Sequence, residues 1–145
     1  MLSSRVITDR KELEDELRRR ATHDPMTGLA NGDLVRQALD QALRSHKAGD
    51  VGLLFCDLDN FKSVNDNLGH EAGDLLICQV AERLLQCTRP GDMLSRLGGD
   101  EFLIVLDGVD SLRAVERIGE RVLSALEPPS TWAPGPCSSR RALAE

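Results

Sequence analysis

The chain is 145 residues long, with 41% hydrophobic residues, 29% charged residues and a formal net charge of −6, a composition typical of one soluble domain with a real core. The acidic balance argues against nonspecific binding to duplex DNA, so we expect no nucleic-acid partner. No apolar run approaches the roughly 20 residues of a membrane span, and the charged start is not an export sequence, so we expect a cytoplasmic chain without a membrane segment.

The four cysteines show no CxxC spacing. Cys56, Cys78 and Cys87 lie within apolar stretches, whereas Cys137 does not. We therefore expect buried free thiols in a reducing compartment rather than a zinc site or disulfides.

Residues 3–23 are rich in charge and helix formers and predict a helix. Its apolar stripe is narrow: Val6, Leu13, Leu17 and Ala21. Such a stripe suits a short coiled coil or a solvated lead-in helix, and the sequence does not separate the two. We take residues 1–22 as a connector and residues 23–127 as the main domain.

Downstream, amphipathic helices are predicted over 33–47, 71–87 and 110–126, with a shorter helix and turn over 60–70. Strands are predicted over 51–56, 92–97 and 101–107, and the first is a continuous apolar run, typical of a strand covered on both faces. This order predicts an α+β fold with helices over a sheet that contains antiparallel strands. Residues 128–145 have no hydrophobic period and hold four of the six prolines, so we expect a disordered tail.

Two pairs of acidic residues are candidates for a catalytic or metal-binding site. Asp57 and Asp59 follow the first predicted strand, and positions i and i+2 of a strand point to one face. Asp100 and Glu101 follow a Gly-Gly pair that is typical of a two-residue hairpin turn. Solvated acids are the plain alternative, but two such pairs on neighbouring buried strands favour a Mg²⁺ site for phosphoryl or nucleotidyl chemistry. A nucleotide-binding module without catalysis is the other interpretation.

Three polar residues between these pairs are ambiguous when taken alone. Lys62 could meet phosphate, although a solvated surface lysine is the favoured interpretation. Asn65 offers both a donor and an acceptor for a base edge. Asp74 falls in the first turn of the helix predicted over 71–87, where a carboxylate suits the helix dipole, so capping is its plain explanation.

Four motifs, in order, resemble those of GGDEF domains, the diguanylate cyclases that make cyclic di-GMP from GTP. Residues 24–31 (DPMTGLAN) resemble the DPLTGLxN opening, and residues 57–66 (DLDNFKSVND) resemble DxDxFKxxND. Residues 69–74 (GHEAGD) are similar to GHxxGD, and residues 96–102 (RLGGDEF) to RxGGDEF. The resemblance covers roughly residues 22–127 and implies a ferredoxin-like sheet, the antiparallel nucleotidyl cyclase palm type with flanking helices.

The resemblance also implies residue roles. Mg²⁺ or Mn²⁺ would be held by Asp57, the Leu58 carbonyl and Asp100. Asp100, Glu101 and Lys62 would form the catalytic set, with Glu101 assisting the 3′-hydroxyl attack or the metal site.

Substrate contacts follow from the same resemblance. They are implied for Asn65 and Asp74 at the guanine edge, His70 near the base, and Lys62 with the backbone around Asn60 and Phe61 at the triphosphate.

The implied reaction condenses two GTP molecules into cyclic di-GMP with release of pyrophosphate. It would require a homodimer, because each domain holds one GTP. Residues 89–92 (RPGD) match the family's RxxD site, at which the product cyclic di-GMP inhibits the enzyme. An incidental pair of Arg89 and Asp92 in a turn is the alternative, and the offset from Gly98 favours the inhibitory site.

The sequence departs from the family near Pro128, where the family continues into a further strand and a helix with basic residues. We therefore expect the last strand and helix to be missing, which would leave the strand over 51–56 with an unpaired edge. Three interpretations stay open: a diguanylate cyclase with intact motifs, a truncated inactive domain that binds GTP or cyclic di-GMP, and an interaction stub that dimerises through residues 3–23.

Overall fold

The structure is a computed structural model that describes residues 2–45 and 50–127, with side chains from residue 7 onward. In chain order its elements are α1 (Leu2–Thr22), α2 (Gly32–Ser45), β1 (Val51–Asp57), α3 (Phe61–Leu68), α4 (His70–Cys87), β2 (Met93–Gly98), β3 (Glu101–Asp107) and α5 (Leu112–Leu126). The predicted helices and strands all form, and their ends differ from the predicted ends by a few residues. The tail expected over 128–145, together with Cys137, lies outside the described residues.

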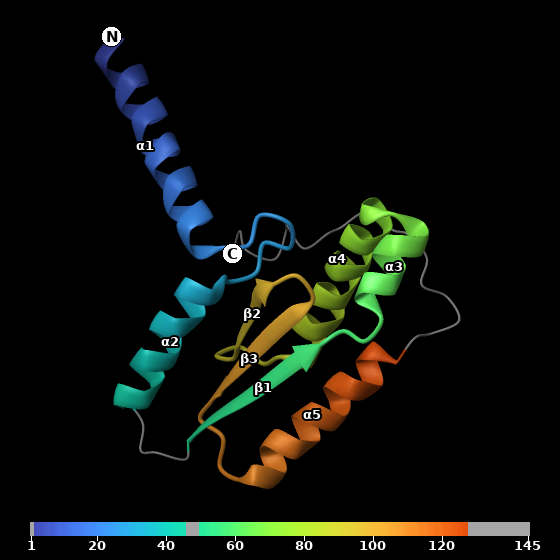
Figure 1. The fold of residues 1–145 in the computed structure, drawn as a ribbon. Coiled ribbons are helices and arrows are strands. Elements are labelled where there is room, and N and C mark those ends of the chain that lie inside the picture. The colour runs from blue at the N-terminus through green and yellow to red at the C-terminus, as the bar shows by residue number, and fades with distance from the viewer. Residues whose placement is uncertain (1, 46–49, 128–145) are drawn as a thin grey trace.

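The three strands form one antiparallel sheet in the order β1-β3-β2 (Figure 1). β3 lies in the middle, and its residues from Phe102 to Leu106 are all buried. The register sets Asp57 at the end of β1 opposite Glu101 at the start of β3. The expected α+β fold, an antiparallel sheet with flanking helices, is confirmed.

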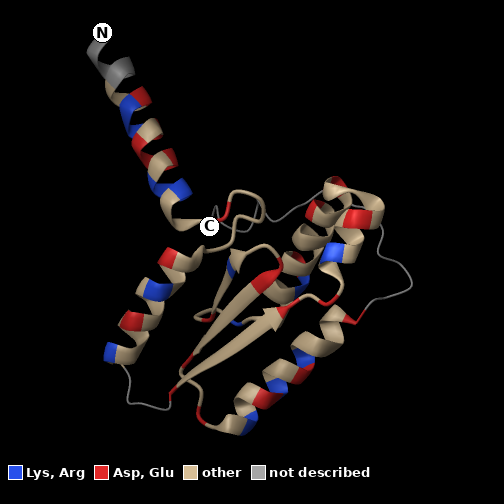
Figure 2. Ribbon diagram, in the orientation of Figure 1, with Lys and Arg blue, Asp and Glu red and all other residues tan. Residues whose placement is uncertain are grey.

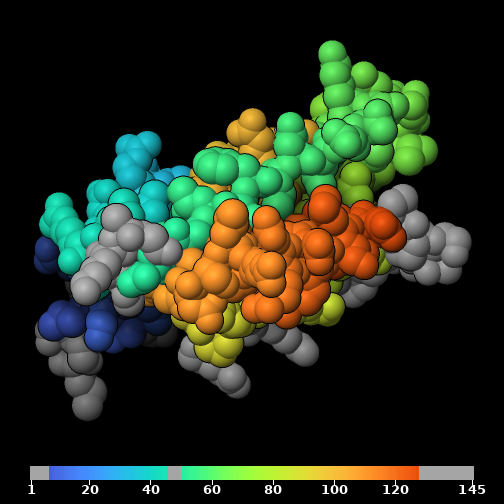
Figure 3. All heavy atoms as spheres, turned by 90° about the horizontal axis from the view of Figure 1, so that it is seen from below, coloured from blue at the N-terminus to red at the C-terminus, as the bar shows by residue number. Residues whose placement is uncertain are grey.

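The side chains of β3 alternate between two apolar layers, as a strand buried on both faces requires. One layer, which α4 and α5 cover, holds the larger core: Phe102, Ile104, Leu106, Ile77, Leu84, Ile118 and Val122. The other layer lies under α2 and is smaller, with Leu103 and Val105 packed around Val35. Seen from below, α5 runs along the surface of the larger layer beside the β1–α3 segment (Figure 3).

β1 is less covered than its apolar sequence suggests. Leu54 and Cys56 pack against the larger core, but Leu53 is 40% exposed and Phe55 is 72% exposed. The prediction that both faces are covered is therefore wrong for this strand. The reason is that α2 packs over β2 and β3 rather than over β1, and within the described residues β1 pairs with β3 alone.

α1 projects away from the sheet and its covering helices (Figure 1). Its apolar side chains, Ile7, Leu13 and Leu17, are exposed along the helix. Ion pairs four residues apart, Arg10 with Glu14 and Arg20 with Glu16, line its surface. In the part of the chain that the structure describes, no helix combines the length and the apolar character that crossing a membrane needs.

Candidate functional site

The acidic residues meet where β1 ends and β3 begins (Figure 2). Asp57 pairs with Glu101 across the two strands, and the Leu58 amide donates to the Asp100 carbonyl oxygen at 3.3 Å. Asp59 follows two residues after Asp57. The hairpin therefore brings together, from positions more than 40 residues apart, the two acidic pairs that the sequence singled out.

A two-residue turn places Asp100 at this edge. Gly98 pairs with Glu101, so only Gly99 and Asp100 lie between the strands, as predicted from the Gly-Gly pair. Gly99 has a φ of 50°, in the left-handed region that glycine reaches without strain. A register shift between Arg96 and Gly98 bends β2 just before the turn. The turn thus projects a carboxylate next to the end of β1.

Negative charge accumulates at this edge. The pKa of Asp57 is raised, chiefly by a side-chain hydrogen bond with Asp100, and further by the charges of Asp100, Glu101 and Asp59. Mutual repulsion of this kind is relieved when a cation binds between the carboxylates. The chemistry of the oxygen donors therefore fits a divalent cation.

The donor set is nevertheless small. Among the described residues, no three side chains of His, Cys, Asp or Glu converge closely enough to hold a metal ion by themselves. A cation bound here would have few protein ligands: the carboxylates of Asp57 and Asp100 and the peptide of Leu58. Most of its coordination positions would be left to water and phosphate. This suits Mg²⁺, which commonly keeps waters and binds through one or two carboxylates plus substrate phosphates.

Arg96 joins the hairpin to the loop that follows α1. Its Nε and Nη2 donate to the Gly99 carbonyl oxygen at 3.0 and 2.8 Å, and its Nη1 lies 3.2 Å from both carboxylate oxygens of Asp24. Asp24 Oδ2 also accepts from the amide and hydroxyl of buried Thr27, at 2.9 and 2.7 Å. Sequence reasoning missed this pair, although both residues stand inside the quoted motifs, because nothing local links positions 72 apart.

The start of α3 leaves backbone donors unoccupied by a side-chain cap. Asn60 adopts a left-handed conformation, φ 65° and ψ 13°, and makes no capping hydrogen bond through its side chain. Asparagine tolerates this conformation better than most residues, and uncapped amides in a first turn are suited to bind anions. Phe61 packs its ring against the core, while Lys62 is exposed beside it. The arrangement can receive phosphate.

Asn65, His70 and Asp74 lie on the paired helices α3 and α4. Asn65 Oδ1 is buried and has no hydrogen-bond partner among the described residues, whereas His70 and Asp74 are exposed. α4 begins at His70 and carries Glu71 in its first turn, so Asp74 lies in the second turn. The capping explanation for Asp74 is therefore wrong: Gly69 precedes the helix, which begins one residue earlier than predicted.

Arg89 and Asp92 close the turn before β2. The Arg89 amide donates to Asp92 Oδ2 at 2.9 Å, and the Arg89 guanidinium approaches both carboxylate oxygens at 3.4 Å. The Asp92 side chain is almost fully buried, and that of Arg89 is half exposed. The RxxD residues thus form a hydrogen-bonded pair that leaves about half of the Arg89 side chain exposed to solvent.

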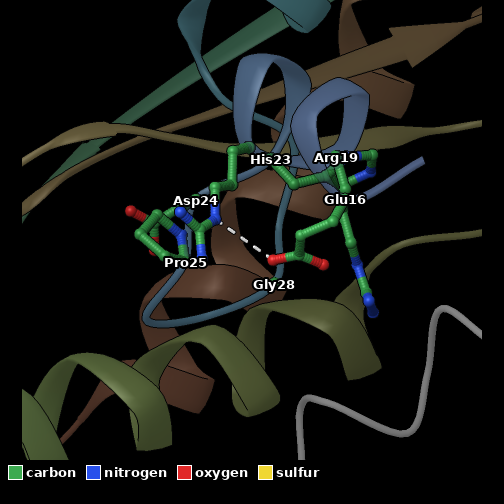
Figure 4. Close-up of a pocket in the computed structure, with 7 residues that line it drawn as sticks. Glu16, Arg19, His23, Asp24, Pro25 and Gly28 are labelled. Atoms are coloured by element: carbon green, nitrogen blue, oxygen red, sulfur yellow. Dashed lines mark hydrogen bonds and ion pairs between the residues drawn. The ribbon is translucent and has the colours of Figure 1, made fainter. Parts of the chain in front are cut away.

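A half-open pocket of about 580 Å³ lies between the end of α1 and the following loop (Figure 4). It is lined by Glu16, Arg19, Arg20, His23, Asp24, Pro25 and Gly28. Arg20 is already paired with Glu16, at 3.1 Å. The acidic edge of the sheet is a better candidate for chemistry, because Asp57, whose pKa is raised by its acidic neighbours, lies there.

Comparison with known proteins identifies the family of this domain. A family model described as diguanylate cyclase, GGDEF domain, matches residues 21–136. Diguanylate cyclase DgcM of Escherichia coli (strain K12) is 41% identical over 102 residues, which are 69% of this chain and 25% of that protein. Cyclic di-GMP phosphodiesterase PdeR of the same organism is 37% identical over 123 residues, 85% of this chain and 18% of that protein. The chain spans about a quarter or less of these relatives.

A solved structure shares the fold as well as the sequence. The coiled coil and GGDEF domain of DgcB from Caulobacter crescentus, in complex with c-di-GMP, matches with a TM-score of 0.73 and 30% identity, covering 83% of this chain and 63% of that one. The family model accounts for most of the chain, and the fold and the four motifs agree with it. This chain belongs to the GGDEF family of diguanylate cyclase domains.

Proposed function

We propose that this chain is a diguanylate cyclase domain that works as a cytoplasmic homodimer and condenses two GTP molecules into cyclic di-GMP. In each of two condensations, the 3′-hydroxyl oxygen of one nucleotide attacks the α-phosphorus of the other, and pyrophosphate leaves. The observation that carries this proposal is the convergence of Asp57 and Asp100, which raises the pKa of Asp57. Membership of the family is compatible with other activities, since the relative PdeR is named a phosphodiesterase.

Asp57, the Leu58 carbonyl and Asp100 would hold Mg²⁺ or Mn²⁺. When bound, such an ion offsets phosphate charge and favours ionisation of the attacking hydroxyl. Glu101 lies opposite Asp57 on β3, where it can accept the proton of the 3′-hydroxyl or support the metal ligands. The pyrophosphate end of GTP would meet the uncapped amides after Asn60, with Lys62 providing a positive charge.

Guanine would be recognised between α3 and α4. Asn65 carries a buried acceptor with no hydrogen-bond partner among the described residues, and Asp74 carries an exposed carboxylate. Guanine presents N–H donors on its Watson–Crick edge, which acceptors of this kind can satisfy. His70 begins α4 and would flank the base.

Dimerisation would use α1. Leu13 and Leu17 are 61% and 57% exposed and lie four residues apart, which favours a helix–helix seam. The DgcB structure is described as a coiled coil together with a GGDEF domain. Cyclic di-GMP would inhibit by binding the ordered pair of Arg89 and Asp92, because the half-exposed guanidinium can still accept a phosphate.

The second candidate is a domain that binds guanine nucleotide or cyclic di-GMP without turnover. The exposure of Phe55 favours it, because β1 carries Asp57 and is supported by a neighbouring strand on one side only within the described residues. A strand held in this way fixes its terminal carboxylate less firmly than a central strand does.

The deciding experiment incubates the purified chain with GTP and Mg²⁺ and measures cyclic di-GMP by chromatography. We expect product from the wild type, loss on chelation, and at least about a 100-fold lower rate for Asp100→Ala. Asp40→Asn, an exposed acid on α2, is the control that should retain the rate. Full activity of Asp100→Ala would refute the metal assignment. No product, together with calorimetric binding of cyclic di-GMP that Arg89→Ala abolishes, would favour the binding module.

A further inference from the structure

Gly73 occupies a position where a helix would normally favour a side chain. It is the fourth residue of α4, it is buried, and its amide donates to the Gly69 carbonyl oxygen as in a regular helix. Glycine inside a helix costs about 0.5–1 kcal/mol relative to alanine. A glycine at this position therefore needs a reason other than the backbone conformation of the helix.

The reason lies in the neighbouring helix. A Cβ atom built on Gly73 would lie 1.8 Å from Asn65 Oδ1, 2.8 Å from Asn65 Cγ and 3.4 Å from Asn65 Nδ2. Apart from the chain neighbours of Gly73 and the nearby backbone of α4, these are the three atoms nearest to that position, and all belong to one carboxamide. Carbon and oxygen atoms that are not bonded normally stay about 3.3 Å or more apart, even in a weak C–H···O contact. The space that Gly73 leaves empty is thus filled by the Asn65 side chain.

The Asn65 carboxamide has a property that helix packing alone does not explain. Its Oδ1 is buried and, among the described residues, accepts no hydrogen bond. Leaving a buried acceptor unsatisfied costs about 1–3 kcal/mol, so such groups are rare where no ligand is expected. The next residue along α4 is Asp74, the other acceptor assigned to the base under the proposed function. Under the proposed function, two consecutive residues of α4 would therefore serve guanine recognition: Gly73 by leaving space for the Asn65 carboxamide, and Asp74 by its carboxylate.

We propose that Gly73 is a positioning residue for guanine recognition, because the absence of its side chain forms the slot that holds the Asn65 carboxamide in its base-reading position. This inference rests on the proposed function for its ligand. Alanine at position 73 would push the carboxamide away by more than 1 Å, and a displacement of this size can cost about 100-fold when it misplaces a polar contact.

The test compares two helix glycines. Gly119 in α5 is the matched control, because a Cβ there would lie 3.7 Å from Leu54 Cδ2, an ordinary contact. Binding of GTP and ATP to the full chain is measured by calorimetry. We expect Gly119→Ala to bind like the wild type, and Gly73→Ala to bind GTP at least about tenfold more weakly. Preference for GTP over ATP should fall in Gly73→Ala, whereas a merely structural defect would weaken both nucleotides alike.

Asn65→Ala supplies the second arm, which does not depend on nucleotide. In the wild-type background, Gly73→Ala should lower the thermal midpoint; in the Asn65→Ala background the slot is empty, and the same change should leave the midpoint unchanged or raise it. Equal shifts in both backgrounds, or unchanged GTP preference in Gly73→Ala, would overturn the proposal. If the wild type binds no nucleotide, the proposed function fails and so does the base-reading role, while the thermal cycle still decides whether the slot exists.

Discussion

Removing the carboxylate of Asp24 should destabilise the domain far more than removing a surface ion pair. Asp24 accepts two hydrogen bonds from Thr27, which is fully buried, and contacts Arg96 Nη1 through both oxygens at 3.2 Å. The side chains of Arg96 and Asp24 are 11% and 16% exposed, so water can replace these bonds only in part. Asp24→Ala removes the carboxylate acceptor of the Thr27 donors and of Arg96 Nη1, while Arg96 Nε and Nη2 keep the Gly99 carbonyl oxygen.

The magnitude follows from these contacts. Stranding the buried Thr27 donors costs about 1–3 kcal/mol, and losing hydrogen bonds to a charged group costs about 1.5–3 kcal/mol. We expect Asp24→Ala to lower the free energy of unfolding by about 3–5 kcal/mol. Small domains commonly have a total free energy of unfolding of about 5–15 kcal/mol, so this loss is a large part of it. Arg96→Ala should cost less, about 2–3 kcal/mol, because the Thr27 donors keep Asp24 as their acceptor.

Urea unfolding of the single and double variants measures the coupling between the two residues. Arg10→Ala is the control: Arg10 lies 3.2 Å from Glu14, the same separation, but the two side chains are 80% and 52% exposed. Such an exposed pair contributes about 0.3–0.5 kcal/mol. A coupling of about 1–2 kcal/mol between Asp24 and Arg96 is expected. If Asp24→Ala costs no more than Arg10→Ala, the reasoning from burial is refuted.

Three further outcomes are expected. Asp57→Asn should raise the thermal midpoint of the metal-free protein at pH 7. The pKa of Asp57 is higher in the folded state than in the unfolded chain, so ionising Asp57 destabilises the folded state. This loss of stability is complete above the raised pKa and vanishes as the pH falls towards the ordinary value of 3.8. An equal gain at pH 7 and near pH 3.8 would contradict this. Phe55→Lys should change the free energy of unfolding by no more than about 0.5 kcal/mol but reduce light scattering during heating, because a charge on an exposed edge strand opposes strand pairing; unchanged scattering would show that the edge is not the site of association. Arg89→Ala should weaken cyclic di-GMP binding by about tenfold or more in calorimetry while leaving Asp92 buried, and unchanged affinity would remove the inhibitory assignment.

Local sequence signals predicted most of the fold because they depend on neighbours in the chain. The start of α2 is one such local feature: Asn31 Oδ1 accepts from the Leu34 amide, three residues later, at 3.0 Å. The Gly-Gly pair predicted the hairpin, and its two strands form. The exposure of Phe55 could not be predicted from its apolar run, because it depends on where α2 packs.

The candidate site was predictable in its residue types and less so in its contacts. The convergence of Asp57 and Asp100 followed from two acidic pairs on adjacent strands. The ion pair between Asp24 and Arg96 and the space that Gly73 leaves for Asn65 could not be predicted from the sequence. Each joins segments that are not neighbouring strands, so it is seen only in the tertiary structure. In both cases one partner is a residue with an ordinary local explanation, a turn aspartate or a helix glycine, which hides the second role.

The geometry divides the site into two parts that can fail independently. The carboxylates of Asp57 and Asp100 depend on the pairing of β1 with β3, and within the described residues no strand pairs with the other edge of β1. The proposed base-reading groups depend on the packing of α3 against α4, where the Asn65 side chain occupies the space beside Gly73. Loosening of β1 would therefore impair cation binding while guanine recognition persists. A chain that selects GTP over ATP but makes no cyclic di-GMP would follow from this division. The loosening would begin at β1, where Phe55 is exposed.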